Sequence, residues 1–379
     1  MPHIAVLFEY PTLNGGEHSM LSVLSRLRQD DQFTFTAIAP PVGPLSQRLA
    51  QLAIPLIPFS TRDQNDSKLP AQELQRRLTN VVAELQPDVL HSNSLSMSRL
   101  SGQLNASEPA ACRRTGHLRD IIKLNKTVVA DLNSNDALIA VSQATLDFHV
   151  AQGLNKDRGC VIYNGVDVNA FRSHKSSTER SQLFPNVPPD AHVLLTVGQI
   201  CLRKGQLNIA KAVRQLLAHR DDIFLAIAGE RHSSKAESVA YEAAIREEFE
   251  TGGKADHLLT LGYRGDIAAL MNAADVLVHA AHQEPFGRTL LEAAACQLPI
   301  IVTNVGGTPE MLQHNRHALL VEPNNVKAIA DAILQQLTNR SLAKSRAASA
   351  RQRIVDNFNV ETAAANLARF WLARKQPAV

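Results

Sequence analysis

Two glutamates, Glu284 and Glu292, stand on either side of a Pro-Phe-Gly turn in the stretch HQEPFGRTLLEAAACQLPIIVTNVGG. An ionised carboxylate only accepts hydrogen bonds, so each glutamate suits a ligand rich in hydroxyl groups, such as a sugar or a ribose. The turn predicts a helix that begins near Arg288, with Glu292 about one turn further on. The dipole at a helix N-terminus would also favour Glu292, but it does not account for Glu284 in the preceding loop.

The same turn also suits phosphate. The first N–H groups of a helix have no acceptor within the helix, so those of Gly287, Arg288 and Thr289 could donate to phosphate oxygens. The next turn, NVGGTPEML, repeats the succession of strand, glycine pair and helix. Because both turns follow strands of the same series, the second turn could close the same pocket.

A cationic turn precedes this region. In TVGQICLRKGQLNIAKAV a predicted strand ends at Gly198, and Arg203 and Lys204 follow just before a helix. Two cations at the carboxyl end of a strand suit a diphosphate. A solvated basic turn is the alternative interpretation.

A glycine pair near the N-terminus is the third candidate. Gly15 and Gly16 in NGGEHSMLSVLSRL would let a ligand approach the main chain where a helix begins. A tight turn without a ligand is the alternative. The third glycine of a dinucleotide-binding fingerprint is missing, so NAD is disfavoured.

The elements that must position these residues alternate along the chain. Short apolar runs separated by helical patterns predict parallel strands buried between helical layers. The predicted strands are 4–9, 35–40, 88–92, 136–142 and 160–164, and then 192–198, 223–229, 258–262, 275–280, 299–303 and 317–322. Two such series predict an α/β protein with two Rossmann-like, doubly wound domains.

Composition sets the domain boundaries. A chain of 379 residues is too long for one ordinary core. We predict an N-terminal domain over 1–171, a polar and proline-rich linker over 172–191, and a C-terminal domain over 192–356. The end of the chain, 357–379, has a helical apolar period and could return to brace the first domain.

Charge and cysteine content exclude several classes of protein. A formal charge of +3, from 39 basic and 36 acidic residues, argues against a nucleic-acid binder. Four cysteines without a Cys-x-x-Cys pair predict neither a zinc site nor a disulfide framework and suit the cytosol. Because no run of about 18 apolar residues exists, no membrane span is predicted. The predicted location is cytoplasmic.

These stretches together resemble a known family. Glu-x7-Glu within EPFGRTLLEA, followed by PIIVTNVGGTPEML and HALLVEP, looks like family four of the retaining, nucleotide-sugar-dependent glycosyltransferases. NGGEHSML, PDVLHSNS, ALIAVSQAT, VIYNGVDVNAF and VGQICLRKG are similar to further family stretches and occur in the expected order. The resemblance covers nearly the whole chain. It implies the GT-B architecture, in which two Rossmann-like domains face each other across a cleft.

The resemblance implies roles for the candidate residues of the second domain. Glu292 would hold the ribose of the nucleotide, and Glu284 would contact the hydroxyl groups of the donor sugar. The backbone of Phe286 and Gly287 would assist Glu284. Lys204 would neutralise the leaving diphosphate.

Other residues would support this donor site. The helix that starts at Arg288 and Thr289 would contribute to diphosphate binding. Gly16 would line the cleft near the donor phosphates or the acceptor. His117, in a loop within RRTGHLRD, is the candidate for the first-domain histidine that faces the donor sugar, although a structural or solvated histidine is the alternative. Arg119 or Asp120 could share that role.

One position departs from the family pattern. The arginine that usually follows the glycine at the end of the strand is replaced by Gln199, and Arg203 could supply the missing cation. The departure motivates an alternative from another class, a non-catalytic nucleotide-sugar-binding protein. A glycosidase would need two carboxyl groups flanking one bond, and phosphate-suited turns do not fit that chemistry.

The predicted activity is transfer of a sugar from a nucleoside-diphosphate sugar, such as a UDP- or GDP-sugar, to a hydroxyl acceptor with retention of configuration. No metal or other cofactor is predicted, because no Asp-x-Asp follows a strand. The acceptor could be a glycan, a lipid-linked glycan or a small molecule. A basic cluster could meet an anionic acceptor or the inner face of the membrane, with a solvated face as the alternative: Arg113, Arg114, Arg119, Lys123 and Lys126.

Overall fold

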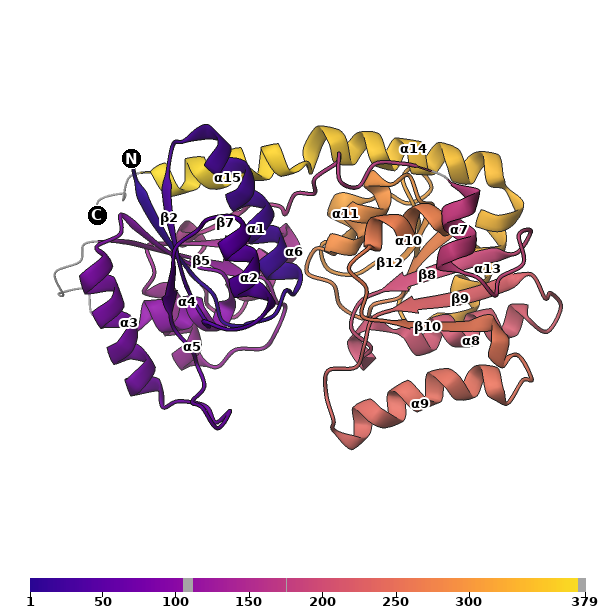
Figure 1. Cartoon of the computed structure of the whole chain (residues 1–379), viewed down its shortest axis with the longest axis horizontal. Coiled ribbons are helices and arrows are strands. Elements are labelled where there is room, and N and C mark those ends of the chain that lie inside the picture. The colour runs from indigo at the N-terminus through magenta and orange to yellow at the C-terminus, as the bar shows by residue number, and fades with distance from the viewer. Residues whose placement is uncertain (105–111, 175, 374–379) are drawn as a thin grey trace. The chain divides into compact units, whose positions relative to one another are not determined.

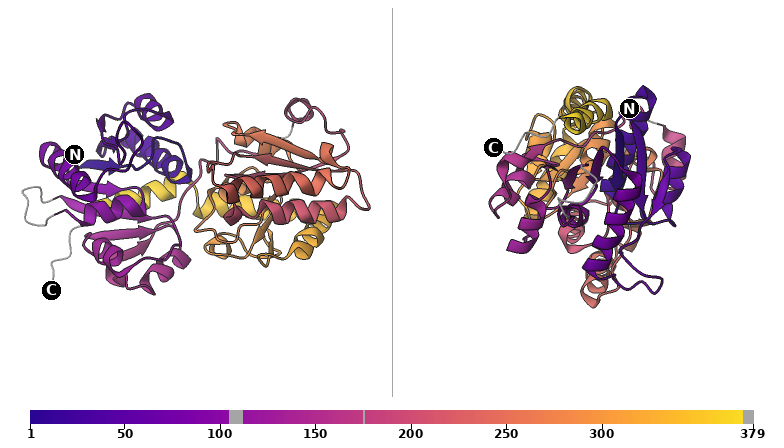
Figure 2. Two further views of the ribbon diagram at one scale, coloured as in Figure 1. Left: turned by 90° about the horizontal axis from the view of Figure 1, so that it is seen from below. Right: turned by 90° about the vertical axis from the view of Figure 1, so that its left-hand side faces the viewer.

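The structure is a computed structural model that describes residues 1–104, 112–174 and 176–373 (Figure 1). The chain divides into two compact units. The first comprises Met1–Gly165 together with the C-terminal residues from Val360 onward, and the second comprises Val166–Asn359. Each unit contains one parallel sheet with helices on both faces, which confirms the predicted pair of Rossmann-like domains (Figure 2).

The sheet of the first unit has seven strands, β1 (His3–Leu7), β2 (Thr34–Ala39), β3 (Leu56–Pro58), β4 (Val89–Ser92), β5 (Arg113–Leu118), β6 (Ala137–Ala140) and β7 (Gly159–Val161). Their order is β3-β2-β1-β4-β5-β6-β7, and all pairs are parallel. The connections change direction between β1 and β4. Ligands of open α/β sheets bind at the carboxyl ends of the strands at such a switch point.

Helices cover both faces of this sheet. They are α1 (Gly15–Leu27), α2 (Pro44–Gln51), α3 (Ala71–Leu85), α4 (Leu95–Gly102), α5 (Lys126–Asn133), α6 (Gln143–Val150) and α15 (Val360–Leu372), with short 3-10 turns at Arg28–Asp30 and Lys156–Arg158. Because successive side chains of a strand point to opposite faces, Ile4 and Val6 pack under α1, α2 and α15, and Ala5 and Leu7 pack under α3 and α4.

The second unit repeats this arrangement with six strands, β8 (His192–Val197), β9 (Ile223–Ala228), β10 (Leu258–Gly262), β11 (Val276–His279), β12 (Ile300–Thr303) and β13 (Leu319–Val321). Their order is β10-β9-β8-β11-β12-β13, so the switch point lies between β8 and β11. The helices are α7 (Ser177–Leu183), α8 (Gln206–Leu216), α9 (Ala236–Glu250), α10 (Ile267–Ala273), α11 (Arg288–Ala295), α12 (Thr308–Met311), α13 (Val326–Thr338) and α14 (Arg340–Asn357), with 3-10 turns at Leu202–Lys204 and Ala255–His257. Buried residues of α8, α9 and α13 form the core over one face of the sheet.

Two strands are absent from the sequence prediction. β3 has only three residues and lies at the edge of the sheet. β5 has the sequence RRTGHL, which lacks the apolar run of a buried strand. Arg113 and Arg114 can begin this strand because their guanidinium groups donate to main-chain carbonyls, including that of Leu104 at 2.6 Å from Arg114. Backbone pairing with β4 and β6, rather than apolar character, holds β5 in the sheet.

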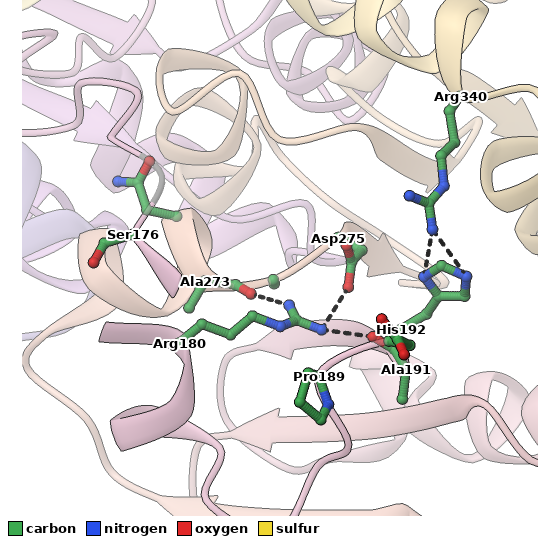
Figure 3. A pocket seen from close by; sticks show the side chains of 11 residues that line it. Ser176, Arg180, Pro189, Ala191, His192, Ala273, Asp275 and Arg340 are labelled. Carbon is green, nitrogen blue, oxygen red and sulfur yellow. Dashed lines mark hydrogen bonds and ion pairs between the residues drawn. The ribbon is translucent and has the colours of Figure 1, made fainter. Parts of the chain in front are cut away.

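The segment 172–191 differs from the predicted linker because it contains α7 and belongs to the second unit. Arg180 of α7 donates to the carbonyl of Ala191 at 2.7 Å and to that of Ala273, and its guanidinium lies 3.1 Å from the carboxylate of Asp275 (Figure 3). These bonds fix the polar segment to the amino ends of β8 and β11. The division between the units falls instead at Gly165, before the segment begins.

The last helix, α15, belongs to the first unit, although α14 just before it belongs to the second. It lies along α1, and its buried residues Ala363, Leu367 and Trp371 join the core that contains β1 and β2 (Figure 1). Within the part of the chain that the structure describes, every helix is too short or too polar to cross a bilayer.

Candidate functional site

The candidate residues of the second unit meet at the carboxyl ends of β8 and β11. The 3-10 turn Leu202–Lys204 follows β8, and the loop after β11 lies against it, with the N–H of His282 donating to the carbonyl of Arg203 at 2.8 Å. Gly205 permits this approach, since a Cβ atom on it would lie 1.9 Å from the carbonyl oxygen of Ala280. Its φ of 67° also favours glycine. The close approach brings Lys204 beside the loop that carries Glu284.

Lys204, Glu284 and His279 form a compact buried cluster. The Lys204 Nζ atom lies 2.7 Å from Oε2 of Glu284, and Nε2 of His279 lies 2.9 Å from the same oxygen. The side chains are 16% exposed for Lys204, 8% for Glu284 and 2% for His279. Within the described residues, the other oxygen of Glu284, Oε1, has no hydrogen-bond partner. The carboxylate is therefore held through Oε2, and Oε1 can accept a hydrogen bond from a hydroxyl group of a ligand.

Electrostatics fix the charge state of this cluster. Burial acts to raise the pKa of Glu284, but Lys204 and the hydrogen bond from His279 outweigh it, so the pKa lies below its ordinary value and the carboxylate is ionised. Burial, assisted by Lys204, lowers the pKa of His279. The ring is neutral at pH 7, and because a carboxylate only accepts hydrogen bonds, its Nε2 carries the proton.

The loop from Glu284 leads directly into α11. Gly287 precedes the helix in the left-handed conformation, and the N–H groups of Arg288 and Thr289 have no hydrogen-bond acceptor among the described residues. The Phe286 ring is buried against Phe358, with ring centroids 5.6 Å apart, so only its backbone can face a ligand. The predicted helix start is confirmed.

Glu292 lies in α11, one turn beyond Arg288. Its Oε1 atom is 2.7 Å from Nη2 of Arg288, and the residue is 5% exposed. Burial raises the pKa of Glu292, and Arg288 opposes the change. A buried carboxylate held by one arginine at the switch point is suited to accepting hydroxyl hydrogen bonds from a ligand.

The remaining candidates of the second unit lie around this cluster. Arg203 is exposed, and its guanidinium donates to the carbonyl of Gln283 at 3.1 Å, next to Glu284. The carbonyl of Gln199 accepts a hydrogen bond from Gln206 at 2.8 Å, which ties the turn after β8 to the start of α8. The second glycine turn meets the same loop, because the N–H of Gly307 donates to the carbonyl of Glu284 at 3.1 Å.

In the first unit, Gly16 lies at the start of α1, close to Arg119 at the end of β5. Arg119 donates to the carbonyl and side-chain oxygens of Asn93 at 3.0 and 2.8 Å, and to Oδ1 of Asn164 at 3.0 Å. A Cβ atom on Gly16 would lie 2.9 Å from Cδ of Arg119. The absence of a side chain on Gly16 therefore leaves space for Arg119. The three hydrogen bonds of Arg119 link the loop after β4 to the loop after β7.

Asn93 adds a free donor at this edge. Its Nδ2 atom is buried, has no hydrogen-bond partner among the described residues, and would lie 3.9 Å from a Cβ atom on Gly16. The N–H groups of Gly15 and Gly16 also have no acceptor within the described chain. Three N–H donors thus lie at the switch point of the first sheet, where they could bind the oxygens of a ligand.

His117 lies in β5 rather than in the predicted loop, and it is 4% exposed. The register pairs His91 with Thr115, and the period of two in a strand places Thr115 and His117 on one face. Nδ1 of His91 is 2.9 Å from Oγ1 of Thr115, and its Nε2 is 2.8 Å from Nδ1 of His117. Burial lowers the pKa of His91 to about 3 and that of His117 well below its ordinary value.

The surroundings of His117 are mainly interior. His117 lines a small cavity, together with Ser19, Arg119 and Leu367. Asp120, the other alternative at this position, is exposed, and its carbonyl lies 2.8 Å from Nε2 of His149. A neutral histidine that borders a cavity can exchange hydrogen bonds with a ligand but cannot supply a positive charge.

The predicted basic cluster is divided by the fold. Three of its guanidinium groups donate hydrogen bonds to carbonyl and amide oxygens of the first unit, namely those of Arg113, Arg114 and Arg119. Lys123 and Lys126 are exposed. The five cations therefore do not form one continuous surface for an anionic partner.

Three residues of these sites were not singled out by the sequence, namely His91, Asn93 and His279. His279 is the last residue of β11 and precedes Glu284 by a short loop. A histidine at the end of an otherwise apolar strand is a recognisable signal of a buried polar contact. His91, near the end of the strand β4, gives the same kind of signal. Asn93 gives none, because its partner Arg119 follows another strand.

Comparison with known proteins agrees with this arrangement. The profile described as Glycosyltransferase Family 4 matches residues 13–170, and the profile described as Glycosyl transferases group 1 matches residues 178–353. A glycogen synthase of Mycobacterium tuberculosis is 30% identical over 219 residues, which cover 57% of this chain and 49% of that protein. The N-acetyl-alpha-D-glucosaminyl L-malate synthase of Bacillus anthracis is 24% identical, with coverage of 63% and 60%. The chain thus matches between about half and three fifths of the length of these relatives.

Solved structures show the same fold. The Anabaena protein HepE, in a crystal with UDP and glucose, superposes with a TM-score of 0.84 over 98% of this chain and 99% of its own, at 22% identity. A glycosyltransferase from Rickettsia africae gives a TM-score of 0.82 over 98% and 97%, at 20% identity. These likenesses confirm the predicted GT-B fold.

Proposed function

Since the chain belongs to the nucleotide-sugar-dependent glycosyltransferases of family four, we propose that it transfers a sugar from a nucleoside diphosphate to a hydroxyl group of an acceptor. The observation that carries this proposal is the buried pair of Lys204 and Glu284, 2.7 Å apart at the switch point of the second sheet. This pair supports the proposal, because a cation suited to a diphosphate lies beside a carboxylate suited to a sugar hydroxyl group.

The donor occupies the carboxyl ends of β8 and β11 in this proposal. Glu292 accepts hydrogen bonds from the ribose, and Oε1 of Glu284 accepts one from the donor sugar, next to the backbone of Phe286 and Gly287. The ammonium of Lys204 has three donors, of which Glu284 takes one. The others are available to the diphosphate, together with the free N–H groups at the start of α11.

The reaction breaks the bond between the sugar and the diphosphate, and negative charge builds on the leaving oxygen. Donors that are already in place stabilise that charge without reorganisation. Lys204 and the N–H groups of Arg288 and Thr289 supply this stabilisation, and Arg203 adds a cation at the rim. We propose that the acceptor hydroxyl group attacks from the face that the diphosphate leaves, so that configuration is retained, and that its proton passes to the leaving diphosphate oxygen. We also propose that no metal ion is needed.

The first unit binds the acceptor in this proposal, at the carboxyl ends of β1 and β4. The N–H groups of Gly15 and Gly16 and the free amide of Asn93 are its donors. For His117 to contact the donor sugar, a sugar hydroxyl group has to reach the small cavity that His117 lines. Turnover by His117→Ala tests this role directly. We propose cytoplasmic action on a glycan, lipid-linked or small-molecule acceptor, with peripheral membrane contact for a lipid-linked one.

The deciding experiment is thermal unfolding in the presence of UDP, GDP, ADP and CMP, followed by turnover with the sugar nucleotides of whichever base binds. UDP-glucose is the first donor to test, because HepE has been crystallised with it. A ligand at about a hundred times its Kd adds about 2.7 kcal/mol to the unfolding free energy, which raises the melting temperature by a few degrees. A shift followed by release of the matching diphosphate establishes the transferase.

Gln199 motivates the second candidate function, a nucleotide-sugar-binding protein without turnover. A thermal shift without turnover would favour it, and Gln199→Arg then separates a binder that lacks a cation from an enzyme that lacks its acceptor. Restored hydrolysis or transfer in Gln199→Arg would identify the missing charge as the cause. An absence of any shift would contradict both candidate functions.

A further inference from the structure

His279 is a buried titratable residue at the donor site that the proposed mechanism leaves without a role. It ends β11, a central strand that pairs with β12 through His279 and Val302 and with β8 on its other side. Its ring reaches back to Glu284, and Nε2 lies 2.9 Å from Oε2. A neutral imidazole buried at this position needs a partner for its N–H, and the carboxylate supplies one.

We propose that His279 is a positioning residue for the donor sugar. Its Nε2–H holds Oε2 of Glu284, so that only Oε1 is presented to the sugar hydroxyl group. The inference rests on the proposed function, because it assigns the sugar contact to Glu284. It goes further by placing the control of that contact in a residue that touches neither the sugar nor the diphosphate.

The need for a second donor follows from the chemistry of Lys204. Its ammonium is a point charge on a flexible stem, and in the proposed reaction it also serves the diphosphate. A lysine alone would let the carboxylate follow the ammonium when the donor binds. His279 is fixed by its place in the sheet, so it keeps the carboxylate in one orientation while Lys204 adjusts.

The consequence is a difference between two ligands. The diphosphate contacts Lys204 and the start of α11, whereas the sugar depends on the orientation of Glu284. Loss of the His279 donor should therefore weaken binding of the nucleotide sugar by about tenfold or more, since a hydrogen bond to a charged group is removed. Binding of the free diphosphate should change by less than about threefold.

The test compares His279→Leu, which removes the donor, with His279→Gln, whose side-chain amide can still donate to Glu284. His219→Gln is the matched control, because His219 is an exposed histidine of the same unit near the end of α8. Dissociation constants for the diphosphate and for its nucleotide sugar are measured by calorimetry, and kcat and KM by diphosphate release. We expect loss of sugar-dependent affinity and of kcat in His279→Leu, recovery in His279→Gln, and no change in the control.

Two outcomes would overturn the inference. Equal weakening of both ligands in His279→Leu would assign His279 a general structural role, and unchanged ligand affinities would remove it from the site. Neither outcome affects the proposed function, which Lys204→Ala tests separately through turnover.

A measurement without ligand keeps the inference testable if no nucleotide binds. Nitrogen-15 NMR of the histidine rings should show His279 neutral, with the proton on Nε2, at pH 7. Glu284→Gln should shift this resonance strongly, and the resonance of His219 should not move. A neutral His279 ring with its proton on Nδ1, or a His279 resonance that does not shift in Glu284→Gln, would refute the hydrogen bond on which the inference depends. Failure of every nucleotide to bind would refute the proposed function alone.

Discussion

Replacing Lys204 by methionine removes the cation that lies 2.7 Å from the buried carboxylate of Glu284 but keeps most of the apolar stem. Both side chains are largely buried, at 16% and 8% exposure. Loss of one partner from a buried ion pair costs about 3–5 kcal/mol, because the other charge is left without compensation. His279 still donates to Glu284, so we expect a loss of about 2–4 kcal/mol in the unfolding free energy of the second unit.

The loss should depend on pH. In the native protein the pKa of Glu284 lies below its ordinary value of 4.5, so the pair stabilises the fold above that pH and the stabilisation declines as the pH falls through the lowered pKa. Without Lys204, burial dominates and the carboxyl group becomes easier to protonate in the folded state. The difference between the two proteins should therefore be largest near pH 7 and should shrink below about pH 4.5.

The assay is urea unfolding at several pH values, followed by hydrogen exchange of peptides from each unit. The single tryptophan, Trp371, is buried in the core of the first unit, so its fluorescence serves as an internal reference for a change confined to the second. Lys211→Met is the matched control, because Lys211 is an exposed lysine of α8. In the double variant with Glu284→Gln, part of the lost stability should return, because no buried charge remains.

Two results would refute this reasoning. Lys204→Met could destabilise the second unit no more than Lys211→Met, which would mean that the pair contributes nothing to the fold. Alternatively, the loss could be the same at pH 4 and pH 7, which would mean that the charge of Glu284 is not its cause.

Three further predictions concern other residues. Glu292→Gln should weaken nucleotide binding. Because the pKa of Glu292 is raised in the folded protein, its ionisation opposes folding, so the unfolding free energy of Glu292→Gln should fall less steeply than that of the native protein as the pH rises above 4.5. Parallel pH profiles of the unfolding free energy for the two proteins would contradict this. Gly205→Ala should destabilise the second unit by about 1–3 kcal/mol in urea unfolding, because the new Cβ atom would overlap a carbonyl oxygen and the residue has a positive φ. If Gly205→Ala destabilised the protein less than Gly265→Ala, a substitution at an exposed glycine, the turn would have to be free to move. His117 should show no titration between pH 5 and 8 in histidine NMR spectra, since burial keeps the ring neutral, and an inflection in that range would show that the ring is solvated.

Much of the second unit could be predicted because its signals are local. Strand, glycine turn and helix follow one another within a few residues around Lys204, Glu284 and Gly287, and the start of a helix leaves free N–H groups wherever it occurs. Glu292 follows from helical spacing alone. The order of strands in a doubly wound sheet then brings the ends of β8 and β11 together. Position at a common edge was therefore predictable, whereas the 2.7 Å contact between Lys204 and Glu284 was not.

The sequence by itself determined the alternation of strands and helices, the two Rossmann-like domains and the residues at their carboxyl edges, because those depend on spacing along the chain. The tertiary structure decided which of these side chains meet. His91 faces His117 through the register of β4 and β5, and Gly16 leaves space for the side chain of Arg119. The segment that composition assigns to a linker forms α7, and Arg180 of this helix fixes it to the second unit. Register, burial and hydrogen bonding between distant segments depend on the whole fold, so no local pattern encodes them.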